Sequence, residues 1–313
     1  MQSDSLSASS KNGNPHGFQW MVLPNGGYQS CGRTRKQLPP GGYSCTQDCY
    51  GRVQIQPQQL LADDYIDFPD GLPSRVLRDI GLFWTLRDRF ERFGFLHRRG
   101  FLFYGKQGCG KSALIHQIVQ GIVAAGHVAF FCVDPRLFLA GMHEFRRVEP
   151  ARLLLCVFED IDAIINRYGD AALLQWLDGN HQVDRVVNLA STNYPERLDR
   201  RIVSRPRRFD RILRIEAPDV RFRDAYFARK MREQPVAERT RWVELTEGLP
   251  FAALAELVIS VECLGNDLEE TVALLRALDA QTPTSLEFSD GPPPDEDDDS
   301  ESESDPATVN CCQ

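Results

Sequence analysis

The chain of 313 residues contains, at residues 101–112, the run Phe101-Leu102-Phe103-Tyr104-Gly105-Lys106-Gln107-Gly108-Cys109-Gly110-Lys111-Ser112. Its last eight residues fit the pattern G-x-x-x-x-G-K-[ST], whose glycines let backbone N–H groups turn toward phosphate oxygens. Lys111 would reach the terminal phosphates of a nucleotide, and the Ser112 hydroxyl would be a magnesium ligand. An apolar strand before the loop and a helical pattern after it supply the required context. This stretch therefore predicts a nucleotide-binding site.

Short apolar runs recur on both sides of this loop and alternate with helical patterns. Runs without polar alternation are typical of strands that are buried on both faces of a parallel sheet. The runs lie at residues 101–104, 127–133, 153–158, 186–190 and 212–215. Before them, residues 74–93 show a helical stripe made of Val76, Ile80, Phe83, Leu86, Phe90 and Phe93. The pattern favours an α/β fold with a parallel sheet flanked by helices.

After residue 218 the apolar runs stop and helices dominate, at residues 222–232, 251–261 and 268–278. We expect four parts along the chain: an irregular, partly β-structured segment with a disordered beginning, an α/β core, a small helical domain and an acidic disordered tail. They span residues 1–60, 61–218, 219–280 and 281–313.

The net charge of −8 belongs to the tail. Residues 281–313 hold 10 Asp and Glu and no Lys or Arg, which leaves 36 basic and 34 acidic residues in the remainder. A near-neutral body disfavours a dedicated nucleic-acid binder. The sequence shows no apolar run near the roughly 20 residues that span a membrane and no secretory signal pattern. We therefore expect a cytoplasmic protein without a membrane segment.

The nine cysteines are interpreted as free thiols of such a protein. Cys31, Cys45 and Cys49, with His16 as a distant fourth ligand, remain an alternative metal site, although their spacing fits no compact zinc pattern.

Two adjacent carboxylates, Glu159 and Asp160, follow the apolar run at residues 153–158. Parallel sheets bind ligands at the carboxyl ends of their strands. One carboxylate can hold Mg²⁺ through water while its neighbour polarises an attacking water. The alternative is an ordinary solvated acidic turn, which the phosphate-binding loop upstream disfavours.

At this point the sequence, from about residue 63 to 278, resembles the AAA family of P-loop ATPases. Gly100 to Gly105 resembles the entry to the Walker A loop, and Cys156 to Asp162 resembles Walker B with its acidic pair in the order Glu-Asp. By position, the resemblance implies that Glu159 binds the metal and that Asp160 polarises the water.

Two later segments extend the resemblance. The segment 189–199 is similar to the sensor segment, which places Asn193 against the γ-phosphate or the attacking water. The segment 204–211 is similar to the arginine-finger segment, with Arg205 and Arg208 at the finger positions and Arg207 where the family has glycine. A basic nucleic-acid patch is the alternative for these arginines.

The resemblance implies ATP and Mg²⁺ as cofactors, a helical lid and a ring oligomer, expected to be a hexamer. Residues 177–179 resemble a segment that links subunits, and the segment at Phe138 is either a pore loop or part of the core. The implied function is ATP hydrolysis coupled to remodelling of a macromolecule, expected to be a protein. A nucleic-acid-directed motor or loader and an ATP-gated scaffold with little turnover are the alternatives.

Overall fold

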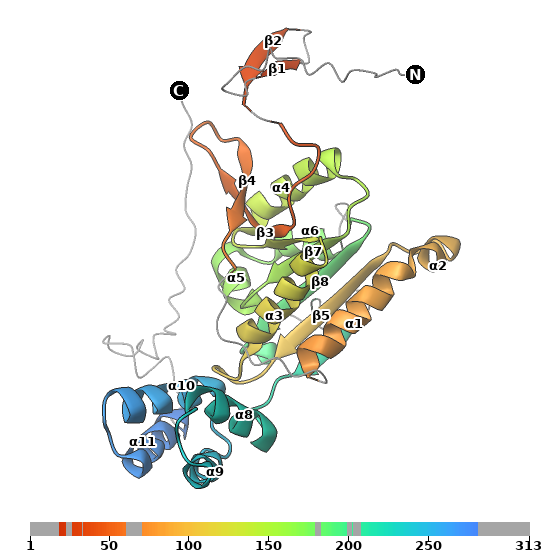
Figure 1. Cartoon of the computed structure of the whole chain (residues 1–313). Coiled ribbons are helices and arrows are strands. Elements are labelled where there is room, and N and C mark those ends of the chain that lie inside the picture. The colour runs from red at the N-terminus through yellow and green to blue at the C-terminus, as the bar shows by residue number, and fades with distance from the viewer. Residues whose placement is uncertain are drawn as a thin grey trace, which may run out of the picture.

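The computed structural model describes residues 19–22, 27–32, 34–60, 71–178, 183–198, 202 and 208–280. Its centre is a seven-stranded sheet in the order β4-β3-β6-β7-β8-β5-β9 (Figure 1). The strands are β3 (Gly41–Gln47), β4 (Val53–Gln58), β5 (Arg98–Tyr104), β6 (Val128–Phe131), β7 (Leu154–Phe158), β8 (Val186–Thr192) and β9 (Arg211–Arg214). Neighbouring strands are parallel except for the antiparallel pair β3 and β4. The parallel α/β sheet expected from the sequence is confirmed.

The register of the central strands brings three loops to one edge of the sheet. Tyr104 at the end of β5 pairs with Thr192 at the end of β8, and Phe158 at the end of β7 pairs with Ala190 of β8. The loops that follow these three strands therefore leave the sheet side by side.

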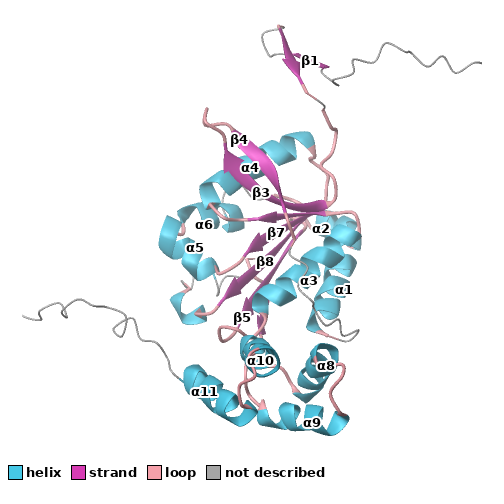
Figure 2. Cartoon of the chain, turned by 60° about the vertical axis from the view of Figure 1, so that its left-hand side comes forward, coloured by secondary structure: helices cyan, strands magenta, loops and turns pink. Residues whose placement is uncertain are grey.

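Helices cover both faces of the sheet (Figures 1 and 2). One face packs against α1 (Leu72–Thr85) and α3 (Lys111–Ala124), with α2 (Arg87–Arg92) after α1. The other face packs against α4 (Pro135–Val148), α5 (Ile161–Tyr168) and α6 (Ala171–Asp178). Consecutive residues of β5 and β7 point into opposite faces, which explains why these strands are apolar without alternation.

The N-terminal strands β3 and β4 belong to this sheet. From the sequence, residues 1–60 are expected to form an irregular segment outside the α/β core, and for these two strands that expectation is corrected. β3 pairs in parallel with β6, and β4 forms the edge. Cys45 of β3 is buried against Gly141 of α4, where an added Cβ would lie 2.2 Å from the Cys45 sulfur. A second, two-stranded sheet is formed by β1 (Gln19–Val22) and β2 (Tyr28–Cys31).

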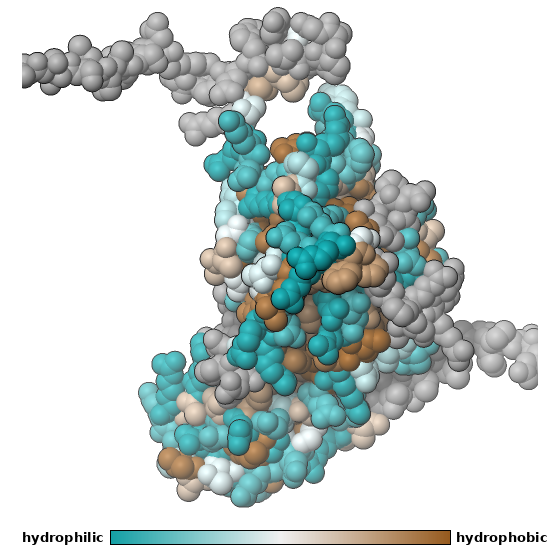
Figure 3. All heavy atoms as spheres, turned by 90° about the vertical axis from the view of Figure 1, so that its right-hand side faces the viewer, coloured by the Kyte–Doolittle hydropathy of each residue, from teal (hydrophilic) through white to brown (hydrophobic). Residues whose placement is uncertain are grey.

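Two details of the core differ from the sequence prediction. The helix expected over residues 74–93 is broken at Leu86, and Phe93, at the end of the predicted buried stripe, is 70% exposed. Figure 3 looks onto this side and shows apolar side chains among polar ones at the surface. Phe138 lies inside α4, where it is buried against Phe158 and Trp176. It is therefore a core residue, and the pore-loop alternative for Phe138 is corrected.

The C-terminal helices form a second small core. They are α8 (Val220–Lys230), α9 (Val236–Leu245), α10 (Phe251–Val258), a π-helical turn (Ile259–Cys263) and α11 (Leu268–Ala280). α9 was not predicted from the sequence, because half of its ten residues are polar and it buries only Trp242 and Val243. Within the described ranges, no helix is both long and apolar enough to cross a membrane.

Candidate functional site

The phosphate-binding loop connects β5 to α3, as the motif requires. Gly108 and Gly110 have φ angles of 77° and 92°, a region that side chains with a Cβ rarely adopt. Lys111, the first residue of α3, is buried, and its Nζ donates to the carbonyl oxygens of Gly105 (2.8 Å) and Lys106 (2.7 Å). Burial lowers the pKa of Lys111, opposed by the nearby Asp160. The loop thus surrounds an ammonium group at the N-terminus of a helix, an arrangement that suits a phosphate.

The acidic pair follows β7 at the same edge, and its two carboxylates have different partners. Glu159 Oε1 lies 3.0 Å from His116 Nε2 of α3. Asp160 has an unusual φ of 46°, and its backbone N–H donates to the Ser191 hydroxyl (3.1 Å). Its Oδ1 accepts a hydrogen bond from Asn193 Nδ2 (3.3 Å). The two acidic residues are therefore held separately, one by α3 and the other by β8.

Burial raises the pKa of Asp160, and the neighbouring carboxylates of Asp162 and Glu159 raise it further, while Lys111 opposes them. Like charges concentrated in a partly buried place favour a bound cation or a bound proton. The edge of the sheet therefore carries a negative cluster directly beside a positive loop.

Thr192 and Asp162 form a further hydrogen-bonded pair at the edge of the sheet that carries the phosphate-binding loop. Thr192, the last residue of β8, donates from its hydroxyl to Asp162 Oδ1 (2.6 Å) and accepts from the backbone N–H of Tyr194 (3.0 Å). These bonds join the acidic turn after β7 to the end of β8. Sequence reasoning missed the supporting roles of His116, Ser191 and Thr192, because no short motif marks a polar side chain that contacts another segment.

Of the two predicted finger arginines, only Arg208 is among the described residues, and its side chain does not reach this edge. Arg205 lies outside the described residues. Arg208 is 3% exposed and lies before β9, where its carbonyl oxygen would be 2.0 Å from a Cβ added to Gly100 of β5. Its Nη2 donates to Asp178 Oδ2 of α6 at 2.5 Å. The Arg208 guanidinium is thus engaged within its own chain.

A hollow of about 200 Å³ adjoins the phosphate-binding loop. It is lined by Lys106, Cys109, Arg214, Ile215, Glu216, Ala217, Gly248, Pro250 and Asp279, from the loop, the end of β9 and the helical domain. The backbone N–H of Ala252 donates to the Gly108 carbonyl (3.2 Å), so α10 directly contacts the loop. Burial raises the pKa of the Cys109 thiol, which makes it a packing residue rather than a reactive one.

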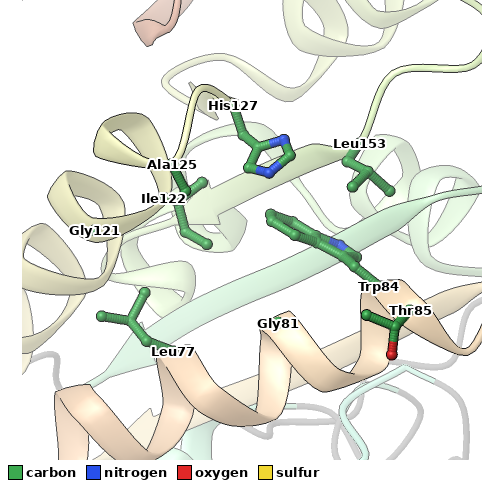
Figure 4. Close-up of a pocket in the computed structure, with 9 residues that line it drawn as sticks. All are labelled: Leu77, Gly81, Trp84, Thr85, Gly121, Ile122, Ala125, His127 and Leu153. Carbon is green, nitrogen blue, oxygen red and sulfur yellow. The ribbon is translucent and has the colours of Figure 1, made fainter.

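A larger hollow of about 480 Å³ lies between α1 and α3 (Figure 4). Trp84, Ile122, His127 and Leu153 are among its lining residues. It lies at the end of α3 and at the starts of β6 and β7, which is the edge of the sheet opposite the phosphate-binding loop. Its lining is mainly apolar and contains no carboxylate, lysine or arginine, so the smaller hollow is the better candidate for a nucleotide.

The residues at the loop fit a magnesium ion. Ser112 and Glu159 offer the hydroxyl and carboxylate oxygens that Mg²⁺ prefers, and the charge around Asp160 would be relieved by a cation. No group of three or more His, Cys, Asp or Glu that could hold a metal occurs among the described residues. Magnesium in phosphate-transfer sites needs only one or two protein ligands because the phosphates supply the others.

The cysteine alternative finds no supporting geometry in the described part of the chain. Cys31, Cys45 and Cys49 are separate free thiols there, and burial raises the pKa of Cys45 to about 12. His16 lies outside the described residues.

Comparisons with known proteins agree with this geometry. The model of the family described as "ATPase family associated with various cellular activities (AAA)" matches residues 101–217. The chain is 32% identical over 223 residues to ATP-dependent zinc metalloprotease FtsH 2 of Sphaerobacter thermophilus, covering 62% of this chain and 33% of that protein. It is 26% identical over 232 residues to ATPase family gene 2 protein homolog A of Homo sapiens, covering 64% and 25%.

A third relative, ATPase family protein 2 homolog of Caenorhabditis elegans, is 29% identical over 192 residues, covering 55% of this chain and 26% of the relative. The chain thus spans a quarter to a third of the length of these relatives. The matched region begins in β5 and ends just after β9, so it contains the phosphate-binding loop, the acidic pair and Asn193. Residues 101–217 are therefore an ATPase domain of the AAA type.

Proposed function

We propose that this chain binds ATP with Mg²⁺ and hydrolyses it. The observation that carries the proposal is the meeting of Lys111, Glu159 and the bonded pair Asp160 and Asn193 at one edge of the sheet. The backbone of the loop and the Lys111 ammonium would bind the phosphates, and the adjoining hollow would take the rest of the nucleotide. Ser112 and Glu159 would hold the magnesium ion, which neutralises charge on the phosphates when it is bound.

Asp160 is proposed to polarise the attacking water. Its raised pKa makes it a better proton acceptor, and its bond to Asn193 holds the carboxylate toward the end of β8. Through this bond, a contact between Asn193 and the phosphate would change the position of the Asp160 carboxylate. In this assignment the first acid after β7, Glu159, binds the metal, and the second, Asp160, acts on the water.

Three substitutions test the proposal. Lys111→Ala should abolish ATP binding in calorimetry. Asp160→Asn should bind ATP but lower phosphate release by about 10²–10⁴-fold, the usual contribution of a general base. Glu159→Gln should raise the magnesium concentration needed for half-maximal turnover. Glu144→Gln, an exposed acid on α4, is the matched control and should change nothing.

Wild-type affinity in Lys111→Ala would refute the nucleotide site. If Glu159→Gln instead traps uncleaved ATP and Asp160→Asn does not, the roles of the two acids are reversed. Negligible phosphate release by the unsubstituted chain, with ATP binding intact, would favour a nucleotide-gated scaffold.

We propose further that the chain assembles into a ring, expected to be a hexamer, in which Arg205 and Arg208 act on the neighbour's ATP. A head-to-tail interface closes into a ring, and an arginine supplied by a neighbour can stabilise charge on the transferred phosphoryl group. The burial of Arg208 against Asp178 adds a step, because Arg208 would have to exchange that carboxylate for the phosphate.

Mixing tests this sharing of sites. Arg205→Ala subunits and Asp160→Asn subunits should each be nearly inactive, and mixed rings should regain part of the activity because some interfaces hold both intact residues. The same experiment with Arg208→Ala in place of Arg205→Ala tests whether Arg208 belongs to the shared site. Co-assembly without any recovery at any ratio would contradict the trans arrangement.

The proposed target of the motor is a protein. One relative is named as an ATP-dependent protease, and the described residues of this chain show no metal-ligating cluster that would carry over its zinc. The near-neutral charge of residues 1–280 disfavours nucleic acid, and salt-dependent stimulation of turnover by DNA would contradict us. We propose a cytoplasmic location, and the free thiols of the described cysteines support this proposal.

A further inference from the structure

His116 connects the phosphate-binding helix to the acidic pair. It lies on α3 five residues after Lys111, and its side chain is 22% exposed. Its Nε2 is 3.0 Å from Glu159 Oε1, and its ring meets the ring of Phe131 edge-on at a centroid distance of 6.1 Å. The imidazole is therefore held by α3 and the end of β6 while its nitrogen faces the carboxylate at the end of β7.

Glu159 benefits from such an anchor. A glutamate has one more methylene group and one more rotatable bond than an aspartate at the same place, so more conformational freedom is lost when its carboxylate is fixed. A hydrogen bond to one carboxylate oxygen restricts that freedom. Groups that donate to a metal-binding carboxylate fix its orientation in this way.

We propose that His116 is a positioning residue for the magnesium site, a role that rests on the proposed function of Glu159 as a metal ligand. His116 donates its Nε2–H to Glu159 Oε1 and thereby directs the carboxylate for coordination. Both the neutral tautomer with a proton on Nε2 and the imidazolium can make this donation, so the role does not require a change of charge.

The rival role for His116 is packing against Phe131, and two substitutions separate the two roles. His116→Gln places an amide N–H close to where Nε2 lies but removes the ring. His116→Phe keeps an aromatic ring against Phe131 but removes the donor. His143→Phe, which changes an exposed histidine of α4, is the control.

The experiment uses the full chain with ADP, and Mn²⁺ as a spectroscopic substitute for magnesium. Free Mn²⁺ is followed by electron paramagnetic resonance during a titration, and ADP affinity is measured separately in EDTA. We expect His116→Phe to weaken Mn²⁺ binding by about 10–100-fold, as is usual when a group that orients a metal ligand is lost. ADP affinity in EDTA should stay at the wild-type value, and His116→Gln and the control should bind Mn²⁺ nearly as wild type does.

Glu159→Gln supplies the second measurement. Adding His116→Phe to Glu159→Gln should not weaken Mn²⁺ binding further, because the group that His116 orients is already changed. If His116→Phe fails to fold, His116→Ala replaces it with the same expected loss.

Wild-type Mn²⁺ affinity in a folded His116→Phe protein would overturn the inference. Equal losses in His116→Phe and His116→Gln would also overturn it, because they would show that the whole ring is needed rather than the donor. If the unsubstituted chain binds neither ADP nor Mn²⁺ with ADP, the proposed function itself fails. That result is distinct from a wild-type chain that binds both while His116 has no effect.

Discussion

Replacement of Gly141 by alanine tests whether the N-terminal strands belong to the ATPase domain. A Cβ added at Gly141 in α4 would lie 2.2 Å from Cys45 Sγ and 3.0 Å from Cys45 Cβ, both in β3. Overpacking of a core costs about 1–3 kcal/mol. Glycine to alanine inside a helix otherwise gains about 0.5–1 kcal/mol. We therefore expect Gly141→Ala to lower the free energy of unfolding by about 0.5–2 kcal/mol, the difference between these effects.

A matched glycine isolates the effect of the helix. Gly81 lies inside α1, and nothing lies within 4 Å of the Cβ that an alanine would add there. Gly81→Ala should therefore raise the free energy of unfolding by about 0.5–1 kcal/mol. The two substitutions are chemically the same, so their opposite signs would come from the contact with β3.

Cys45→Ala should relieve the clash, because it removes the sulfur that lies closest to the new methyl group. In the Cys45→Ala background, Gly141→Ala should be nearly neutral, which corresponds to a coupling of about 0.5–2 kcal/mol between the two positions. Urea unfolding followed by far-ultraviolet circular dichroism measures all four variants, with the slope of each transition checked for constancy. If Gly141→Ala stabilises as Gly81→Ala does, or if the two positions do not couple, β3 does not pack on α4 as described.

A hydrogen bond, a buried thiol and the acidic C-terminal segment can each be tested separately. Ser191→Ala removes the acceptor of the Asp160 backbone N–H, so it should lower the rate of phosphate release while ATP affinity stays unchanged; equal turnover would show that the bond is dispensable. In the folded protein, peptide mapping after iodoacetamide treatment should find exposed Cys263 labelled and Cys156 protected, because burial raises the pKa of Cys156; early labelling of Cys156 would contradict its burial. Deletion of residues 281–313 should leave the melting temperature and ATPase rate nearly unchanged, since this acidic segment offers no apolar periodicity, and a large drop in melting temperature would show that it docks.

The sequence predicted the central strands well because each is a short apolar run that must be buried on both faces. Residues 153–158 and 186–190 became β7 and β8 with nearly the same bounds. The irregular N-terminal segment was harder to place. β4 alternates partly buried and exposed residues, and its partner β3 joins the sheet through pairing with β6, which lies more than 80 residues later in the chain. No local pattern marks such a pairing.

In the helical domain too, an element that depends on a tertiary contact could not be predicted from local sequence patterns. α10 and α11 carry apolar residues at helical spacing, and the sequence analysis found both. α9 was not predicted because residues 238–241 in its middle are all polar and its burial depends mainly on Trp242, which packs against Phe227 of α8. A single large side chain stabilises this helix through a tertiary contact. Such a contact leaves no periodic apolar pattern in the sequence.

The sequence by itself determined the phosphate-binding loop and the acidic pair, because a turn rich in glycine and two carboxylates after a buried strand follow from local chemistry. Only the tertiary structure decided which side chains hold these groups. His116 meets Glu159 across 43 residues, and Arg208 meets Asp178 across 30. Such contacts depend on strand order and helix packing, because the free energy that brings distant residues together comes from the buried core rather than from the contacting residues themselves.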